Sequence, residues 1–209
     1  MFEKTNWKAV SAEIMGTFFL VFFGVSALAN NDTTIVNSEG VAESSFTGFV
    51  GLITLALTLF VLVHILGPVS GCHLNPVITI PTFLSDKMDK DTTIAYICGQ
   101  IIGACLGFYL FDLINPGTND SVLDGDSALL LAAAVGTTFF VTSLLTTQDP
   151  ASIGATLFIV SSTAFGDVNP GVSLGNMIVS DLDFMFFGII GSLIGCVAGW
   201  AIKENIIDQ

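Results

Sequence analysis

Six long apolar runs constrain this chain more than any other feature of its sequence. The sequence predicts membrane-spanning helices at about residues 9–29, 46–66, 93–111, 128–147, 150–165 and 184–202, of which the fifth is the weakest. Each run approaches the ~20 residues that a helix needs to cross a bilayer. Because backbone polar groups in lipid must pair within their own segment, the runs predict an all-α membrane protein, a bundle of helices within the lipid bilayer.

Charged residues make up 11% of the chain, against about 25% in soluble domains, and they are unevenly placed. The five basic residues are all lysines, namely Lys4, Lys8, Lys87, Lys90 and Lys203. If the N-terminus is cytoplasmic, six spans put every lysine on the cytoplasmic side, as the positive-inside rule requires. We therefore expect cytoplasmic termini and a location in the cell (plasma or inner) membrane. The charged residues of the opposite loops are all acidic, so no nucleic acid is expected as a partner.

Two Asn-Pro pairs interrupt the apolar pattern at corresponding places in the two halves. The first lies in the segment 70–79 after span two, and the second lies in the segment 165–175 after span five. Small-residue spacing repeats as well, at Gly99, Gly103 and Gly107 in span three and at Gly191, Gly195 and Gly199 in span six. Three spans per half give an inverted 3+3 repeat within one channel domain, residues 1–209, with repeats at about 1–115 and 127–209.

The Asn-Pro pairs predict two short helices that begin inside the membrane. Proline at the first helical position loses no hydrogen bond, since its missing N–H would be unpaired there anyway. As N-caps, Asn75 and Asn169 accept bonds from backbone N–H groups two or three residues on, which leaves each amide nitrogen as a donor toward the lumen. Two positive helix ends at mid-membrane favour neutral polar solutes over cations. Extended residues before the first turn, Gly71, Cys72 and His73, are expected to line the pore.

These segments resemble the two signatures of the aquaporin, or major intrinsic protein, family. The matching positions are Ser70, Gly71, His73, Asn75, Pro76 and Thr79 in the first signature, and Asn169, Pro170, Ser173 and Gly175 in the second. The resemblance covers the whole chain and implies six transmembrane helices plus two re-entrant half-helices. It implies the pore motifs Asn75, Pro76, Val77 and Asn169, Pro170, Gly171, and a homotetramer with one pore per subunit. It makes Glu13 and Gln100 supports of a re-entrant loop, with a proton relay as the alternative for Glu13.

The filter positions depart from the family pattern. Where the family has an arginine after its second Asn-Pro-Ala, this chain has Val172, and the other filter positions fall at Leu55, Leu157 and Gly166. Such a ring holds no guanidinium, imidazole or aromatic group. It therefore resembles neither the water-selective members nor the glycerol facilitators, and a wide apolar filter is expected.

Other departures concern the scaffold. Val77 and Gly171 replace the two alanines of the family's motifs, and Gly171 should loosen its half-helix. Pro81 lies within the first half-helix and should remove the bond to the Val77 carbonyl. Few residues separate span four from Asn169, so either span five is short or the outer vestibule is shallow. His64 is expected to pack within its helix, and Cys72 faces either the lumen or the protein interior.

The expected function is passive passage of water and small uncharged solutes, with glycerol, urea and ammonia as candidates. Two alternatives remain open from the sequence: a channel that leaks ions or protons, and a structural membrane protein whose pore is closed. The sequence contains no nucleophile–base set, metal-ligand cluster or phosphate-binding glycine loop, so no enzyme activity, catalytic residue, cofactor or metal is expected.

Overall fold

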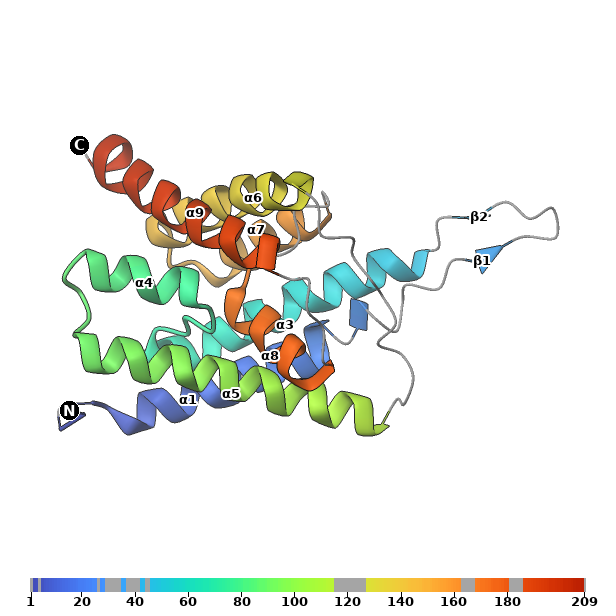
Figure 1. Cartoon of the computed structure of the whole chain (residues 1–209), viewed down its shortest axis with the longest axis horizontal. Helices are drawn as coiled ribbons and strands as arrows, with labels where there is room; N and C mark the ends of the chain where they lie inside the picture. Colours follow the sequence, from blue (N-terminus) through green and yellow to red (C-terminus); the bar gives the residue numbers. More distant parts are fainter. Residues whose placement is uncertain are drawn as a thin grey trace.

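A computed structural model describes residues 2–3, 5–25, 27–28, 35–36, 42–43, 46–114, 127–162, 168–180 and 186–208. Helices form almost all of this part of the chain (Figure 1). The first half contains α1 (Trp7–Phe19), its π-helical continuation η1 (Leu20–Val25), α3 (Phe46–Ser70), α4 (Pro76–Leu84) and α5 (Lys90–Ile114). The second half contains α6 (Ser127–Thr146), α7 (Pro150–Ser162), α8 (Pro170–Ser180), α9 (Phe186–Ile202) and its π-helical continuation η2 (Lys203–Ile207).

The six predicted spans correspond to α1 with η1, α3, α5, α6, α7 and α9. Within the described part of the chain, four stretches are long and apolar enough to cross a membrane, namely Trp7–Gly24, Phe49–Ser70, Lys90–Ile114 and Phe186–Ile207. The apolar helical stretches Leu130–Thr146 and Pro150–Ser162 are shorter. The 13 residues of α7 rise only about 20 Å, which is less than the ~30 Å of a hydrocarbon core. Helix α7 is thus the short fifth span that the sequence allowed.

A short β-pairing lies in the connection between η1 and α3. Strands β1 (Ile35–Val36) and β2 (Ala42–Glu43) are antiparallel, with Ile35 opposite Glu43 and Val36 opposite Ala42. The pairing lies at the end of the bundle away from the two chain termini (Figure 1). The expectation of helices alone did not include it, and it adds a small hairpin to an otherwise helical fold.

Glycines allow the helices of each half to approach closely. In the first half, a Cβ atom at Gly103 of α5 would lie 2.3 Å from the carbonyl oxygen of Ile14 in α1. In the second half, a Cβ atom at Gly195 of α9 would lie 2.4 Å from the carbonyl oxygen of Ala134 in α6. The repeated small-residue spacing therefore forms equivalent helix contacts, α1 with α5 and α6 with α9, as an inverted repeat requires.

The two short helices α4 and α8 lie in the middle of the bundle. Figure 1 shows both chain termini at one end, which we call the terminal end, and shows α4 extending toward it. Helix α8 extends toward the opposite end (Figure 1). The N-termini of α4 and α8 therefore approach each other from opposite directions, which places the two Asn-Pro motifs at one site.

Candidate functional site

Both Asn-Pro motifs begin a helix in the same way. Asn75 has an extended backbone and its side-chain oxygen accepts from the Val77 N–H at 3.0 Å, with Pro76 as the first helical residue. The side-chain oxygen of Asn169 accepts from the N–H groups of Gly171 at 3.1 Å and Val172 at 3.3 Å. Each asparagine thereby fixes its own side chain with the amide nitrogen directed away from the helix it caps.

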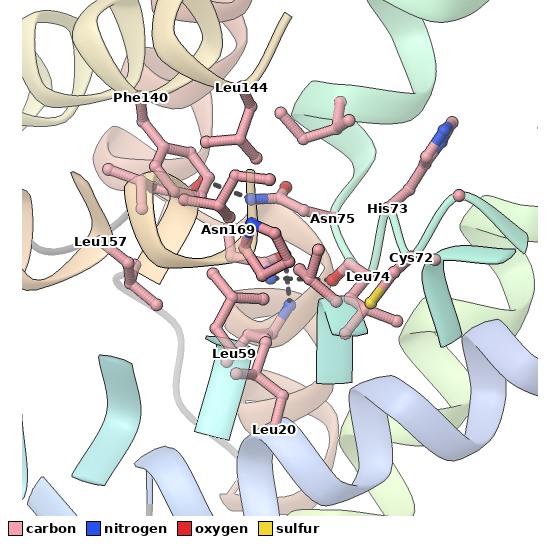
Figure 2. A pocket seen from close by; sticks show the side chains of 18 of the residues that line it. Leu20, Leu59, Cys72, His73, Leu74, Asn75, Phe140, Leu144, Leu157 and Asn169 are labelled. Atoms are coloured by element: carbon pink, nitrogen blue, oxygen red, sulfur yellow. Dashed lines mark hydrogen bonds between the residues drawn. The ribbon is translucent and has the colours of Figure 1, made fainter. Parts of the chain in front are cut away.

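The two asparagines are joined across the site by reciprocal hydrogen bonds. The amide nitrogen of Asn75 donates to the carbonyl oxygen of Val168 at 2.8 Å, and that of Asn169 donates to the carbonyl oxygen of Leu74 at 3.0 Å. Figure 2 shows the two side chains next to each other at the centre of the cavity. A primary amide has two N–H bonds, so one N–H of each asparagine holds the opposite loop and the second N–H is a further donor at the same place. Sequence reasoning did not foresee these cross-loop bonds.

The turns also touch through their first residues. A Cβ atom at Gly171 would lie 3.0 Å from Cδ of Pro76 and 3.3 Å from Oδ1 of Asn169. Val77, on the other motif, is completely buried. The missing methyl group at Gly171 thus leaves room for Pro76 of the first motif, and the larger side chain of Val77 packs in the apolar core.

The loop before Asn75 adopts a left-handed backbone at three positions. The φ angle is +83° at Gly71, +50° at Cys72 and +50° at Leu74. For residues with a Cβ atom this conformation costs roughly 1–2 kcal/mol each, so the loop needs bonds that hold it in place.

The carboxylate of Glu13 supplies those bonds from α1. This side chain is completely buried, and its two oxygens accept four hydrogen bonds. The donors are the Ser70 hydroxyl at 2.6 Å, the backbone N–H groups of His73 at 3.0 Å and Leu74 at 2.7 Å, and the Gln100 amide at 2.8 Å. Because backbone donors of the loop are bound directly, the carboxylate compensates for the strain of the left-handed residues.

A second layer of polar groups surrounds the carboxylate. The Gln100 amide also donates to the Thr79 hydroxyl at 3.0 Å, and Nδ1 of His73 lies 3.1 Å from the same hydroxyl oxygen. Tyr96 donates its hydroxyl to the Ser70 carbonyl at 2.9 Å. The structure therefore brings together Glu13, Gln100 and the first loop.

A cavity of about 1100 Å³ passes the two asparagines. Its wall includes Thr82 and Lys87 near the terminal end, and Asn176 of α8 on the far side of the asparagines. Most of the lining is apolar, and Figure 2 shows Leu20, Leu59, Phe140, Leu144 and Leu157 around the asparagines. A few amide and carbonyl groups thus face a largely hydrocarbon wall.

Three of the four predicted filter positions line this cavity: Leu55, Leu157 and Val172. Leu55 and Leu157 are each only 7% exposed, because they also belong to the apolar core. Gly166 lies outside the described residues, so the ring of four is described only in part. Gly71, Cys72 and His73, predicted to line the pore, are also in the cavity wall.

One expectation about a histidine was wrong. His64 is exposed and lines the cavity, whereas it was expected to pack within its helix. Residues Leu55, Leu59, Val63 and Gly67 of α3 line the same cavity at intervals of four, which is one face of a helix. His64 borders that face, so the spacing from Leu55 contained the signal that could have placed it. Cys72, expected to face either the lumen or the protein interior, is 5% exposed and lies in the cavity wall.

The inverted halves, the re-entrant helices and the shared cavity define a multi-pass membrane protein with a cavity where its two halves meet. A family model described as Major intrinsic protein matches residues 1–149, which is more than half of the chain. The chain therefore belongs to the major intrinsic protein family, and the resemblance seen in its sequence is confirmed. Members of this family are channels and not enzymes, so the chain is a membrane channel for water and small solutes.

Similar proteins support this assignment. Aquaporin NIP1-1 of Zea mays is 28% identical over 212 residues, covering 92% of this chain and 72% of that protein. Aquaporin AqpM of Methanothermobacter thermautotrophicus is 28% identical over 200 residues, covering 84% of this chain and 79% of its own length. The solved aquaglyceroporin from Plasmodium falciparum aligns with a TM-score of 0.70 over 96% of both chains. At 18% sequence identity that last match shows the fold, six spans with two re-entrant half-helices.

Proposed function

We propose that this channel passes water together with other small uncharged solutes, such as glycerol, urea or ammonia, through a wide apolar filter. The filter consists of Leu55, Leu157, Gly166 and Val172. The observation that carries the proposal is the position of Val172, which follows the second Asn-Pro turn and lines the cavity. The chain contains no arginine, so no other residue can supply a guanidinium to this filter.

The absence of the guanidinium changes which solutes can pass. An arginine offers up to five N–H donors in a rigid fork and fills part of the lumen. Valine offers no donor and is smaller, so the constriction is wider and binds water less strongly. Uncharged solutes larger than water then fit, and they lose fewer contacts on leaving the filter.

In this proposal Asn75 and Asn169 supply the hydrogen-bond donors that a passing solute meets. The N–H that each amide does not use across the site is available to the oxygen of a passing solute. Carbonyl groups of Gly71, Cys72 and His73 accept from the same solute farther along the wall. A neutral molecule exchanges its water hydrogen bonds for these, whereas a cation meets the positive ends of α4 and α8.

Glu13 and Gln100 act as supports of the first re-entrant loop in this scheme. Four short bonds to the carboxylate favour this role over proton relay, because all of them fix the position of the loop or of Gln100. The two repeats, at about 1–115 and 127–209, each contribute one half-helix to the pathway.

The proposed topology has both termini in the cytoplasm and the protein in the plasma or inner membrane. The described lysines all lie in the parts nearest the terminal end: Lys8 at the start of α1, Lys87 between α4 and α5, Lys90 at the start of α5 and Lys203 directly after α9. Their common side agrees with the positive-inside rule. A homotetramer with one pore in each subunit is the assembly we propose from the family resemblance.

Substitution of Val172 tests the filter assignment. In proteoliposomes, Val172→Arg is expected to reduce glycerol and urea flux relative to water flux, while Val172→Leu retains an apolar filter and serves as the control. Unchanged glycerol and urea flux in Val172→Arg would count against the assignment. Currents in planar bilayers under an ion gradient would favour an ion leak, and the absence of any flux would favour a closed structural protein.

A further inference from the structure

The cavity wall carries very little charge. Of the described residues that form it, Lys87 is the only one with a permanent charge, and none is a carboxylic acid. The two histidines, His64 and His73, also line it. A lysine at this place is notable because neither the two Asn-Pro motifs nor the filter positions contain a basic residue.

Lys87 is held at the terminal end of the cavity by the turn that follows α4. Its backbone N–H donates to the Thr82 carbonyl at 3.0 Å, and Asp86 before it has a left-handed φ of 56°. The Ser85 hydroxyl donates to Glu204 at 3.1 Å and accepts from the Trp200 indole N–H at 2.9 Å. The turn is thereby fastened both to α4 and to the C-terminal helix, so the position of Lys87 is defined although its side chain is exposed.

The charge of Lys87 lies where the fold would otherwise attract cations. Helix α4 begins at mid-membrane, so its negative C-terminal end faces the terminal-end mouth of the cavity. The nearby carboxylates Asp86, Asp89 and Asp149 are not in the cavity wall. Asp89 and Asp149 cap the following helices, and bonds from Thr92 and Ser152 hold their pKa values below the usual range.

We propose that Lys87 is a charge-selectivity residue of this channel. Its ammonium group offsets the negative end of α4 and lowers the local concentration of cations before they reach Asn75 and Asn169. Charge exclusion then has two stages, one at the terminal-end mouth and one at the paired half-helices. This proposal builds on the channel function and is independent of the filter assignment at Val172.

Charged thiol reagents measure the potential at this mouth directly. Gln148 is exposed and, like Lys87, lines the cavity, so Gln148→Cys places a thiol in the same cavity wall in the full-length protein. Labelling rates are compared for two methanethiosulfonates of similar size in proteoliposomes, one sulfonate and one trimethylammonium. The labelled peptide is identified by mass spectrometry, which separates it from the native cysteines. The ratio of the two rates cancels accessibility and reports charge.

We expect Lys87→Gln to lower the anion-to-cation rate ratio about fourfold, and Lys87→Glu to lower it further, as the screened potential of a unit charge in the same cavity wall implies. The matched control is Lys90→Gln, because Lys90 is exposed and is not in the cavity wall. An unchanged ratio in Lys87→Gln, or an equal change in Lys90→Gln, overturns the proposal. If neither Gln148→Cys nor Thr147→Cys is labelled, the mouth is closed and the proposal is overturned as well. Neutral-solute flux in the same vesicles reports separately on the filter.

Discussion

The thiol of Cys196 lies 3.4 Å from the carbonyl oxygen of Val77 and donates a hydrogen bond to it. In an uninterrupted helix the N–H of residue 81 would bind this carbonyl, but Pro81 has no N–H. Val77 is completely buried and Cys196 of α9 is 1% exposed, so without the thiol this carbonyl would be buried and unpaired. A thiol from the second half thus completes the half-helix of the first, and α4 continues to Leu84.

Removing that donor should destabilise the protein. Cys196→Ala and Cys196→Ser create similar small voids, but only serine retains a donor for Val77. We expect the alanine variant to be less stable than the serine variant by about 0.6–1 kcal/mol, the usual value of such a bond in a membrane protein. Thermal unfolding of the detergent-solubilised protein measures the difference.

Pro81→Ala provides the control for this pair. Because alanine restores the N–H at residue 81, Cys196→Ala should cost less in the Pro81→Ala background than in the wild type. A double-mutant cycle measures this coupling. Equal costs in both backgrounds would show that the thiol does not serve the Val77 carbonyl.

Glu13→Gln should weaken the first re-entrant loop. A neutral amide offers one acceptor oxygen and presents N–H groups to donors of the loop, so at least two of the four bonds to Glu13 are lost. Bonds to a charged group contribute about 1.5–3 kcal/mol each, and we expect a loss on the order of 3 kcal/mol together with reduced flux. Unfolding and flux are measured on the same preparation. Glu3→Gln is the control, because Glu3 is exposed, and a similar loss in both variants would contradict the role of Glu13.

Mercurial reagents should block the channel through Cys72. All four cysteines are free, and Cys72 is the only one in the described cavity wall. Water and glycerol flux should therefore fall after treatment of the wild type and remain unchanged in Cys72→Ser. Cys98→Ser should stay sensitive, since Cys98 is exposed on the outside of α5. Undiminished flux through wild-type protein in which Cys72 is labelled would remove this assignment.

Gly195→Ala should disrupt the contact between α6 and α9. The added Cβ would lie 2.4 Å from the Ala134 carbonyl oxygen, which is closer than real Cβ contacts and requires the backbone to shift. Overpacking of this kind costs about 1–3 kcal/mol. Gly67→Ala is the matched control in α3, because nothing lies within 4 Å of a Cβ atom there. Equal thermal stability of the two variants would contradict the close approach of α6 and α9.

The sequence was sufficient to predict the spans and the position of each half-helix. Hydrophobic runs fix where helices cross the bilayer, and an Asn-Pro pair caps a helix through bonds within a few residues. These local rules alone did not place Glu13 beside the loop, and the family resemblance was needed for that prediction. They also left a short fifth span as one of two possibilities, because the distance from span four to Asn169 limits its length.

The remaining features depend on contacts between distant segments. The reciprocal bonds of Asn75 and Asn169 need both loops in place, and no periodicity indicates them. The bond from Cys196 to Val77 joins residues 119 positions apart, and the sequence indicated only that Pro81 leaves a carbonyl free. His64 was misplaced because its own neighbours are apolar, although the spacing of four from Leu55 marks the cavity face. The β1–β2 pairing arises in a connection whose sequence has no strong strand pattern.

Stopped-flow light scattering on proteoliposomes tests most directly whether the joined half-helices form an open path for uncharged solutes. The vesicles are exposed in turn to impermeant, glycerol and urea gradients and compared with protein-free liposomes. The structure predicts faster shrinkage under the impermeant gradient, followed under glycerol and urea by accelerated re-swelling. Vesicles that shrink and re-swell at the protein-free rate under all three gradients would contradict it.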